Sequence, residues 1–179
     1  MDNCQEAQRH LLAVLDSQEA ASTQALINLT TAFSTCACWP TLLLNSANDS
    51  ANHTSVTWLL KAWLEQGNRL DDQQSATWLA LTPALTQWQA RLHILQCLPG
   101  FSIPESLRSL TEHMVREALA DSNKFVRAWA YTGLDTLARQ FPQYRDERNT
   151  LFQMSLQDEA PSVKARIRQL IKAQKGEQV

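Results

Sequence analysis

Four cysteines and four histidines are the side chains of this sequence best suited to metal or redox chemistry. Cys36 and Cys38 are separated by one residue, which is too close for a zinc knuckle, and no second Cys or His pair complements them in the sequence. The adjacent Trp39-Pro40 indicates the end of a helix with small buried side chains. No histidine has H-x-x-x-H or HExxH spacing, so we expect no metal and no cofactor, and surface or half-buried positions for His10, His53, His93 and His113.

Basic side chains near the C-terminus are the best candidates for contact with a partner. Lys164, Arg168 and Lys172 recur every four residues, which places them on one face of a helix. Arg127 and Arg139, on the preceding repeat, would extend this set into a patch for an anionic group. The alternative is that these charges only solvate an exposed terminal helix.

Aromatic side chains offer a second set of candidates, because six tryptophans are many for this length. Trp58, Trp63 and Trp88 lie on or beside apolar stripes, so we expect them in the core. Trp129 falls near the edge of its stripe, beside Tyr131. It either seals the interface between repeats, which we favour, or borders a groove, and we include Tyr131 among the candidate partner-binding residues.

Motifs for other catalytic chemistry are missing from the sequence. There is no Gly-rich phosphate loop, no G-x-S-x-G elbow and no carboxylate pair with a specific spacing. The acidic pair Asp71-Asp72 is typical of a helix N-terminus, where the helix dipole favours negative charge. The sequence therefore predicts a protein that is not an enzyme.

Composition favours helices over strands as the elements that position these residues. The chain has 179 residues, 44% of them hydrophobic and 19% charged, with only four Gly and six Pro to make turns. The net charge is −2, but residues 1–90 carry three basic and eight acidic side chains, whereas residues 91–179 carry thirteen basic and ten acidic. This asymmetry directs any anionic partner to the C-terminal half.

The expected environment is a reducing cytoplasm without membrane contact. The cysteines do not resemble the disulfide framework of small secreted domains, and the first residues lack the pattern of a signal peptide. No apolar run approaches the roughly 18 residues that a membrane span requires.

The C-terminal half is the clearest part of the pattern. Ser102 and Glu105 have the spacing of a capping box, which predicts a helix start there. Breaks follow at residues 121–123, at Pro142 and at Pro161, and the tail from residue 172 is expected to fray. Between them, apolar stripes predict four helices, marked in turn by Leu107, Leu110, Met114 and Ala118; by Val126, Ala130, Leu134 and Leu137; by Tyr144, Arg148, Leu151 and Ser155; and by Val163, Ile167, Leu170 and Ile171.

These four helices form two copies of one unit with a period of 37 residues. Each copy has an aspartate at the turn, a valine five residues later and then a basic residue: Asp121, Val126 and Arg127 in the first, and Asp158, Val163 and Lys164 in the second. This pattern resembles the signature of HEAT repeats, in which the aspartate and the basic residue form a ladder between neighbouring repeats and the valine packs in the core. The resemblance implies an all-α right-handed superhelix of about four helix pairs.

The resemblance covers residues 103–142 and 143–175 and weakens upstream, although residues 1–179 are expected to form one domain. Residues 84–98 resemble the second helix of a degenerate repeat, with Pro83 in place of the ladder aspartate and Leu85, Trp88, Leu92 and Leu95 inward. Further helices are predicted from three sets of apolar residues: Val56, Leu59, Leu60 and Trp63; Ala25, Leu26, Leu29 and Phe33; and Ala7, Leu11 and Val14.

The resemblance and the missing motifs favour a non-enzymatic scaffold that binds another protein. An alternative is a HEAT-like alkyl-purine DNA glycosylase, in which Trp129 and Asp135 would face the damaged nucleotide beside Arg127, Arg139 and Arg168. The negative net charge argues against it, so nucleic acid is the less favoured partner. A chromophore lyase or chaperone-like subunit is a third alternative that no residue selects.

Overall fold

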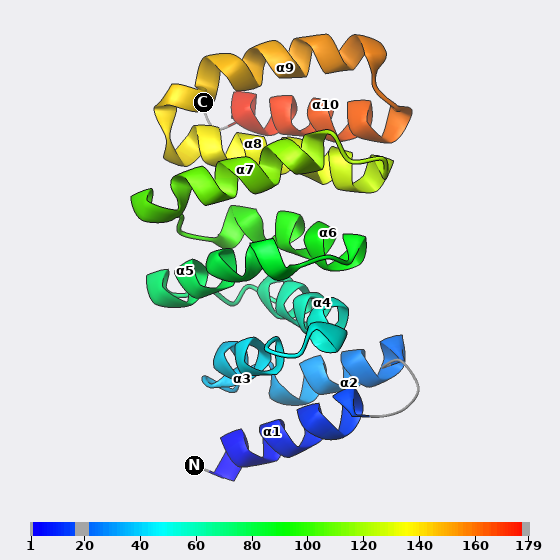
Figure 1. The fold of residues 1–179 in the computed structure, drawn as a ribbon, viewed down its shortest axis with the longest axis vertical. Helices are drawn as coiled ribbons and strands as arrows, with labels where there is room; N and C mark the ends of the chain where they lie inside the picture. Colours follow the sequence, from blue (N-terminus) through cyan, green and yellow to red (C-terminus); the bar gives the residue numbers. More distant parts are fainter. Residues whose placement is uncertain (1, 17–21, 177–179) are drawn as a thin grey trace.

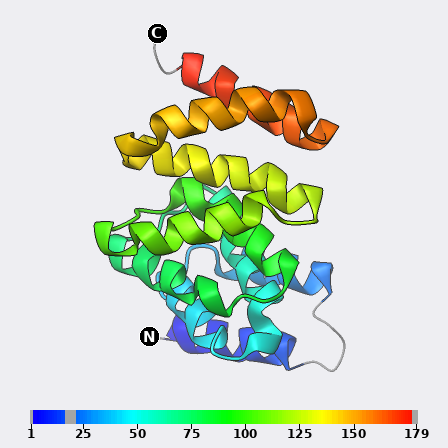
Figure 2. The same ribbon diagram turned by 45° about the horizontal axis from the view of Figure 1, so that its top comes forward.

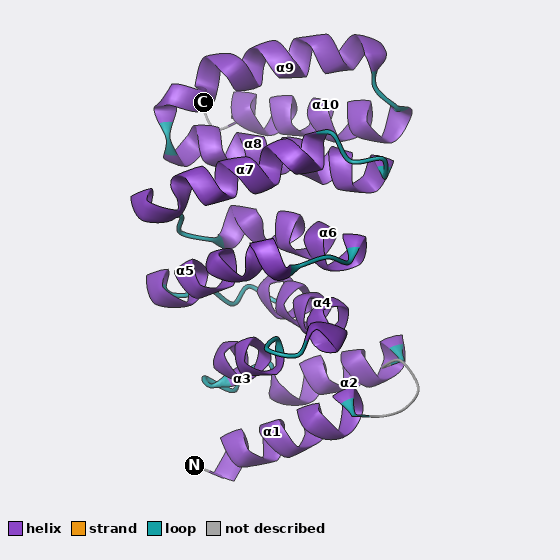
Figure 3. Ribbon diagram, in the orientation of Figure 1, coloured by secondary structure: helices purple, strands orange, loops and turns teal. Residues whose placement is uncertain are grey.

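Helices joined by loops and turns make up the residues that the computed structural model of the protein describes, 2–16 and 22–176 (Figures 1 and 3). These ranges contain no strand, which confirms the all-α prediction. The ten α-helices are α1 (Asp2–Leu15), α2 (Thr23–Phe33), α3 (Trp39–Ser46), α4 (His53–Glu65), α5 (Asp72–Leu81), α6 (Trp88–Cys97), α7 (Arg108–Leu119), α8 (Lys124–Gln140), α9 (Arg145–Asp158) and α10 (Pro161–Gly176).

The helices stack along the longest axis of the molecule, with α1 at one end and α9 and α10 at the other (Figures 1 and 2). Helices α4, α6, α8 and α10 contact one another in series, and so do α3, α5 and α7. Short loops join neighbours such as α3 and α4, α7 and α8, and α9 and α10, which also pack together. Each helix therefore buries its apolar stripe against helices close to it in the sequence.

The C-terminal helices begin and end close to the predicted breaks. Asn123 caps α8 by accepting a hydrogen bond from the Phe125 amide, and Phe141 ends the helix immediately before Pro142. Val126 and Val163, the equivalent valines of the two units, are both fully buried. The tail was predicted to fray from residue 172, but α10 continues to Gly176, so residues 172–176 are helical. The rest of the predicted tail, residues 177–179, lies outside the described ranges.

The capping box expected at Ser102 and Glu105 is not formed. Residues 105–107 make a 3-10 turn, and α7 begins at Arg108 without a side-chain cap. A capping box does occur at α5, where the Gln74 amide donates to Asp71 Oδ1 at 2.7 Å and the Asp71 amide donates to Gln74 Oε1 at 3.0 Å. The expectation of a helix start at Asp71-Asp72 is thereby confirmed.

The buried stripe of α7 is rotated from the predicted one. Thr111, Val115 and Ala118 are buried, whereas Leu110 and Met114 are only half-buried. Sequence spacing alone favoured the larger apolar side chains as the core face. The smaller residues lie inward because α7 packs directly on α8, and small side chains permit that approach.

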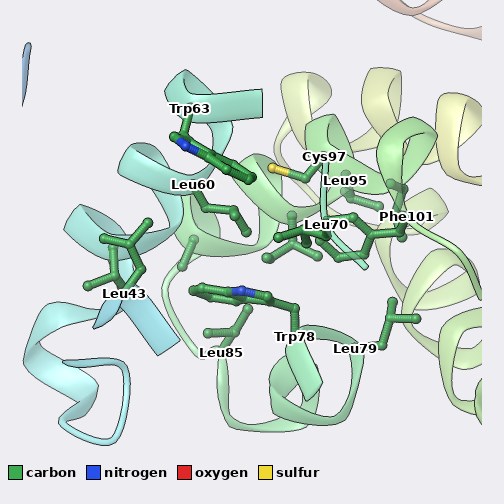
Figure 4. Packing of buried hydrophobic residues seen from close by; sticks show 14 of the residues in the cluster. Leu43, Leu60, Trp63, Leu70, Trp78, Leu79, Leu85, Leu95, Cys97 and Phe101 are labelled. Carbon is green, nitrogen blue, oxygen red and sulfur yellow. The ribbon is translucent and has the colours of Figure 1, made fainter. Parts of the chain in front are cut away.

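The larger core extends from α1 to α8, and Figure 4 shows part of it, with Trp63 and Trp78 among the buried side chains. Trp39 and Trp78 are fully buried, and Trp63 donates a hydrogen bond from its indole nitrogen to the Ser34 carbonyl at 2.9 Å. Helix α3 begins at Trp39, so Cys38 precedes a helix rather than ending one, contrary to the prediction. A smaller core lies between α8, α9 and α10 and consists of Ala128, Tyr131, Phe152, Val163 and Ile167.

The burial of Trp88 and of His53 differs from what the sequence predicted. Trp88, expected inward, is 40% exposed at the first residue of α6. His53, expected at the surface or half-buried, is buried, and its Nε2 lies 3.0 Å from the Ala47 carbonyl oxygen. This contact with the preceding turn gives one of its two ring nitrogens a hydrogen-bond partner.

Gly133 lies where α8 approaches α6 and α7 most closely. A Cβ at this position would lie 2.8 Å from Val115 Cγ2, 3.2 Å from Leu98 Cδ1 and 3.4 Å from Leu95 Cδ2. Valine in a helix has little rotamer freedom with which to move away. We therefore expect Gly133→Ala to lower the free energy of unfolding by about 1–3 kcal/mol, despite the better helix propensity of alanine.

Urea denaturation followed by circular dichroism measures this change. Gly176→Ala is the matched control, because nothing lies within 4 Å of a Cβ built at Gly176. A Gly133→Ala protein as stable as its parent would contradict the close packing of α8.

His93 on α6 faces α4, and its Nδ1 lies 3.1 Å from the Thr57 hydroxyl. Burial and the nearby Lys61 ammonium lower the pKa of His93 from 6.5 to about 4, although a backbone hydrogen bond with Thr54 and the Glu65 carboxylate oppose this. The unfolded chain thus binds a proton at a pH where the folded chain does not. Stability should therefore fall as the pH drops from 6.5 toward 4, by about 3 kcal/mol in total.

Denaturation midpoints measured across this pH range test the prediction against His93→Gln, which cannot titrate there. The carboxylates common to both proteins cancel in the comparison. Parallel pH profiles for the two proteins would exclude a neutral, buried imidazole.

Candidate functional site

The basic residues predicted to bind a partner differ in exposure. Arg168 and Lys172 of α10 and Arg139 of α8 are exposed. Lys164 is half-buried, and its ammonium donates a hydrogen bond to the Gln157 carbonyl at 2.7 Å. Lys164, one of the three residues of the predicted basic stripe, is therefore engaged in a hydrogen bond that holds the turn between α9 and α10.

Arg127 and Arg139 do not extend that stripe, because carboxylates neutralise both. Arg127 Nε donates to Glu159 Oε1 at 3.0 Å, and Arg139 Nε donates to Asp135 Oδ2 at 2.7 Å. The bond with Glu159 raises the pKa of Arg127, and Arg127 in turn lowers the pKa of the Glu159 carboxyl group. An anion approaching this face would have to displace the bound carboxylates.

A line of charges crosses neighbouring repeats close to where the ladder was expected. Arg91 of α6 pairs with Asp121 at 3.4 Å. Arg127 Nη1 donates to the Asp121 carbonyl at 2.9 Å, while Arg127 Nε donates to Glu159. The carboxylate that pairs with Arg127 before α10 is Glu159, one residue beyond the predicted Asp158. Glu159 also accepts a hydrogen bond from the Ala160 amide, whereas Asp158 is exposed at the end of α9.

Tyr131 and Trp129 serve the packing between helices. Tyr131 is buried against the edge of Phe152 and is hydrogen-bonded to the Ser155 hydroxyl. Contrary to the prediction, its side chain is therefore not accessible to a partner. Burial raises the pKa of Tyr131. Trp129 is half-buried, and the Arg166 guanidinium of α10 lies 3.5 Å from the centre of its ring. This cation–π contact seals α8 against α10, the alternative that we favoured for Trp129.

Asp135 is a buried carboxylate that links α8 to the two helices after it. Its oxygens accept hydrogen bonds from Arg139, from Arg148 of α9 at 2.8 Å and from Gln174 of α10 at 2.7 Å. The side chain is only 4% exposed. All of these donors belong to the protein itself, so the carboxylate acts as a clamp between helices.

A concave surface lies between α6 and α7 and contains none of the residues predicted to bind a partner. Its first part, a groove of about 510 Å³, includes the apolar side chains of Leu85, Leu95, Leu110, Met114 and Ala118 in its lining. A second hollow of about 660 Å³ adjoins it and shares Thr86, Arg91 and Glu117 with it. Together, these two hollows form the α6–α7 groove.

The α6–α7 groove combines an exposed aromatic ring with an acidic edge. Trp88 lines its second hollow, and the largely exposed Glu117 lines both hollows. Arg91 is already paired with Asp121, and His113 lies 3.4 Å from Glu117. An apolar side chain fits the floor, and Glu117 remains available to a basic group.

The α6–α7 groove was not predictable from the sequence, because its lining residues come from two helices whose relative position is defined only by the fold. Trp88 and Met114 were both expected in the core. One signal was present: Trp88 lies between Gln87 and Gln89, and polar neighbours on both sides favour a partly exposed ring at the start of a helix.

A second cluster absent from the predictions unites three cysteines. Cys4 of α1 lies beside Cys36 and Cys38, and Cys4 and Cys38 form a disulfide. The sequence offered no second Cys or His pair to complement Cys36 and Cys38, and the structure adds a single cysteine, which comes from 32 residues upstream of Cys36. Only the packing of α1 on α2 and α3 brings it there.

Comparison of the chain with protein-family models, with curated proteins and with solved structures found no match. Among the described residues, no helix has the length and apolar character required to cross a membrane.

Removing the Asp135 carboxylate would leave Arg148, which is 12% exposed, without its charged partner. We expect Asp135→Ala to lower the free energy of unfolding by about 3 kcal/mol, the lower end of the range for a broken buried pair, because Arg139 remains partly solvated. Urea denaturation measures the effect.

Asp158→Ala provides the control for this prediction, because Asp158 is an exposed acidic residue on α9. It should change stability by less than about 0.5 kcal/mol. Equal effects of the two substitutions would contradict the clamp at Asp135.

Proposed function

We propose that this chain is a non-enzymatic scaffold that binds an extended segment of another protein in the α6–α7 groove. The observation that carries the proposal is the exposed Trp88 beside a concave, apolar surface. Aromatic residues beside desolvated pockets are typical anchors of protein interfaces. The groove runs across two helices, as expected for a binding surface on stacked helix pairs.

Two features support assignment of the stack to the HEAT type, with a right-handed superhelix. Successive second helices contact one another, from α4 through α6 and α8 to α10. The charges of Arg91, Asp121, Arg127 and Glu159 connect three of these repeats, as a ladder would. A cytoplasmic location is also part of this proposal.

The partner segment should combine apolar side chains with at least one basic residue. Leu110 and Met114 offer apolar surface to an inserted side chain, and Trp88 provides a flat ring at its edge. Glu117 lies in both hollows and would pair with a lysine or arginine of the segment. Charge would then set the orientation of the segment, and apolar burial most of its affinity.

The DNA glycosylase alternative is less well supported. A catalytic carboxylate must reach the nucleotide, yet Asp135 accepts hydrogen bonds from three side chains of the chain itself. Arg127 and Arg139, which would contact phosphates, are paired with carboxylates. We therefore retain the protein-binding function as the conclusion, and no observation favours a lyase or chaperone-like role.

Photo-crosslinking from within the groove tests this function. A benzophenone amino acid replaces either Trp88 or Met114, and the full-length protein is irradiated in cells that produce it. We expect the same protein to be captured from both positions, because both line the groove. Glu117→Lys in the same chain should reduce the yield several-fold by repelling a basic segment.

Met154 provides the matched control, because it is 59% exposed on α9, far from the groove. The same probe at Met154 should not capture that protein. Equal capture from all three positions, or capture of nucleic acid in place of protein, would refute the proposed function.

A further inference from the structure

Three sulfur atoms meet at the end of the molecule opposite α10. Cys4 and Cys38 are bonded, and Cys36 Sγ lies 2.9 Å from Cys38 Sγ and 3.7 Å from Cys4 Sγ. The three side chains offer ligand atoms that all lie within 4.8 Å of one another. We call these residues the thiol cluster.

The backbone around the thiol cluster holds Cys36 and Cys38 on the same side of a tight turn. The Cys36 amide donates to the Phe33 carbonyl, and the Trp39 amide donates to the Cys36 carbonyl, both at 3.0 Å. Cys38 is the residue before α3, so its carbonyl accepts the first hydrogen bond of that helix, from Leu42. The turn is therefore determined by α2 and α3 and does not depend on a sulfur–sulfur bond.

The third sulfur is held in place by the packing of α1. Ala7 and Leu11 of α1 are buried in the main core, close in sequence to Cys4. Cys36 is itself 4% exposed, while Cys4 and Cys38 are half-buried. Apolar contacts would thus keep Cys4 near the turn after its bond to Cys38 is broken.

We propose that the reduced thiol cluster is a three-thiolate binding site for a soft cation, Cu⁺. A thiolate-bound ion lies about 2.3 Å from each sulfur, so ligands of one ion lie within about 4.6 Å of one another. The Cys36 sulfur lies within this limit of both other sulfurs, at 2.9 and 3.7 Å. After reduction, the Cys4 and Cys38 sulfurs need only move apart for all three to surround one ion. Soft thiolates select Cu⁺ and Zn²⁺ over hard cations.

The number of ligands selects Cu⁺ between these two ions. Zinc in structural sites requires four ligands, and within the described residues the cluster has no fourth His, Cys, Asp or Glu. Cu⁺ is satisfied by three thiolates in a plane. The N-terminus of α3 adds favourable electrostatics, because its dipole stabilises negative charge on the sulfur of Cys38.

Formation of the site requires reduction of the disulfide first. Two molecules of a low-molecular-weight thiol supply two electrons and two protons, the Cys4–Cys38 bond breaks to two thiols, and the reductant becomes its own disulfide. Cu⁺ then replaces the protons of the three thiols, which are released to solvent. No change in the oxidation state of copper is needed.

The test is an anaerobic titration of the reduced, full-length protein with Cu⁺ against a chromophoric Cu⁺ chelator, followed by X-ray absorption spectroscopy. We expect one ion per chain, with three sulfur ligands. Cys36→Ser should lose one sulfur ligand and bind more weakly, and serine at all three positions should abolish binding. Far-UV circular dichroism shows whether each variant remains folded.

Cys97→Ala is the matched control, since burial raises the pKa of the Cys97 thiol and the residue lies in the main core. It should bind Cu⁺ as the parent does. Binding that survives in the folded triple-serine protein, only two sulfur ligands in the parent, or tighter binding of Zn²⁺ than of Cu⁺ would each overturn the proposal.

Discussion

The structure depends on the packing of one helix, α8, against four others. Helices α6, α7, α9 and α10 all contact α8, and every residue from Ala130 to Ala138 is buried. A helix covered on several sides must be apolar or internally satisfied all round. Gly133 leaves room for the side chains of Val115, Leu98 and Leu95 that pack against α8. Asp135 is the buried charge of α8, and it accepts hydrogen bonds from Arg148 of α9 and Gln174 of α10. The positions of both repeats beside α8 follow from these two residues.

This constraint also forms the α6–α7 groove. The inward face of α7 carries small side chains because the helix lies directly on α8, which leaves Leu110 and Met114 only partly covered. The same two side chains then face Leu85 and Leu95 across the gap to α6. Close packing on one side of α7 thus produces incomplete packing on the other. A groove of this origin is continuous with the core, because Leu85 and Leu95 of its lining are themselves buried core residues.

The sequence predicted the helices of the C-terminal half because their apolar spacing and their breaks are local properties. Val126 and Val163 are buried as expected, and the turns near Asp121 and Pro142 lie where composition placed them. The candidate site was not predictable in this way. Spacing along one helix says which residues share a face but not which helix covers that face. Trp88 was therefore expected inward, and Tyr131 outward, when the packed structure has the reverse.

The groove and the thiol cluster share no residue and lie in different parts of the stack, so their proposed activities are separable. In stacked helix pairs, stability is largely a sum of each pair and its interfaces with neighbours. A cation or disulfide at Cys4 and Cys38 therefore acts first on α1, α2 and α3. The α6–α7 groove is supported by α8 and does not contain these helices. Changes at the thiol cluster should consequently alter the stability of the N-terminal helices without altering the shape of the groove.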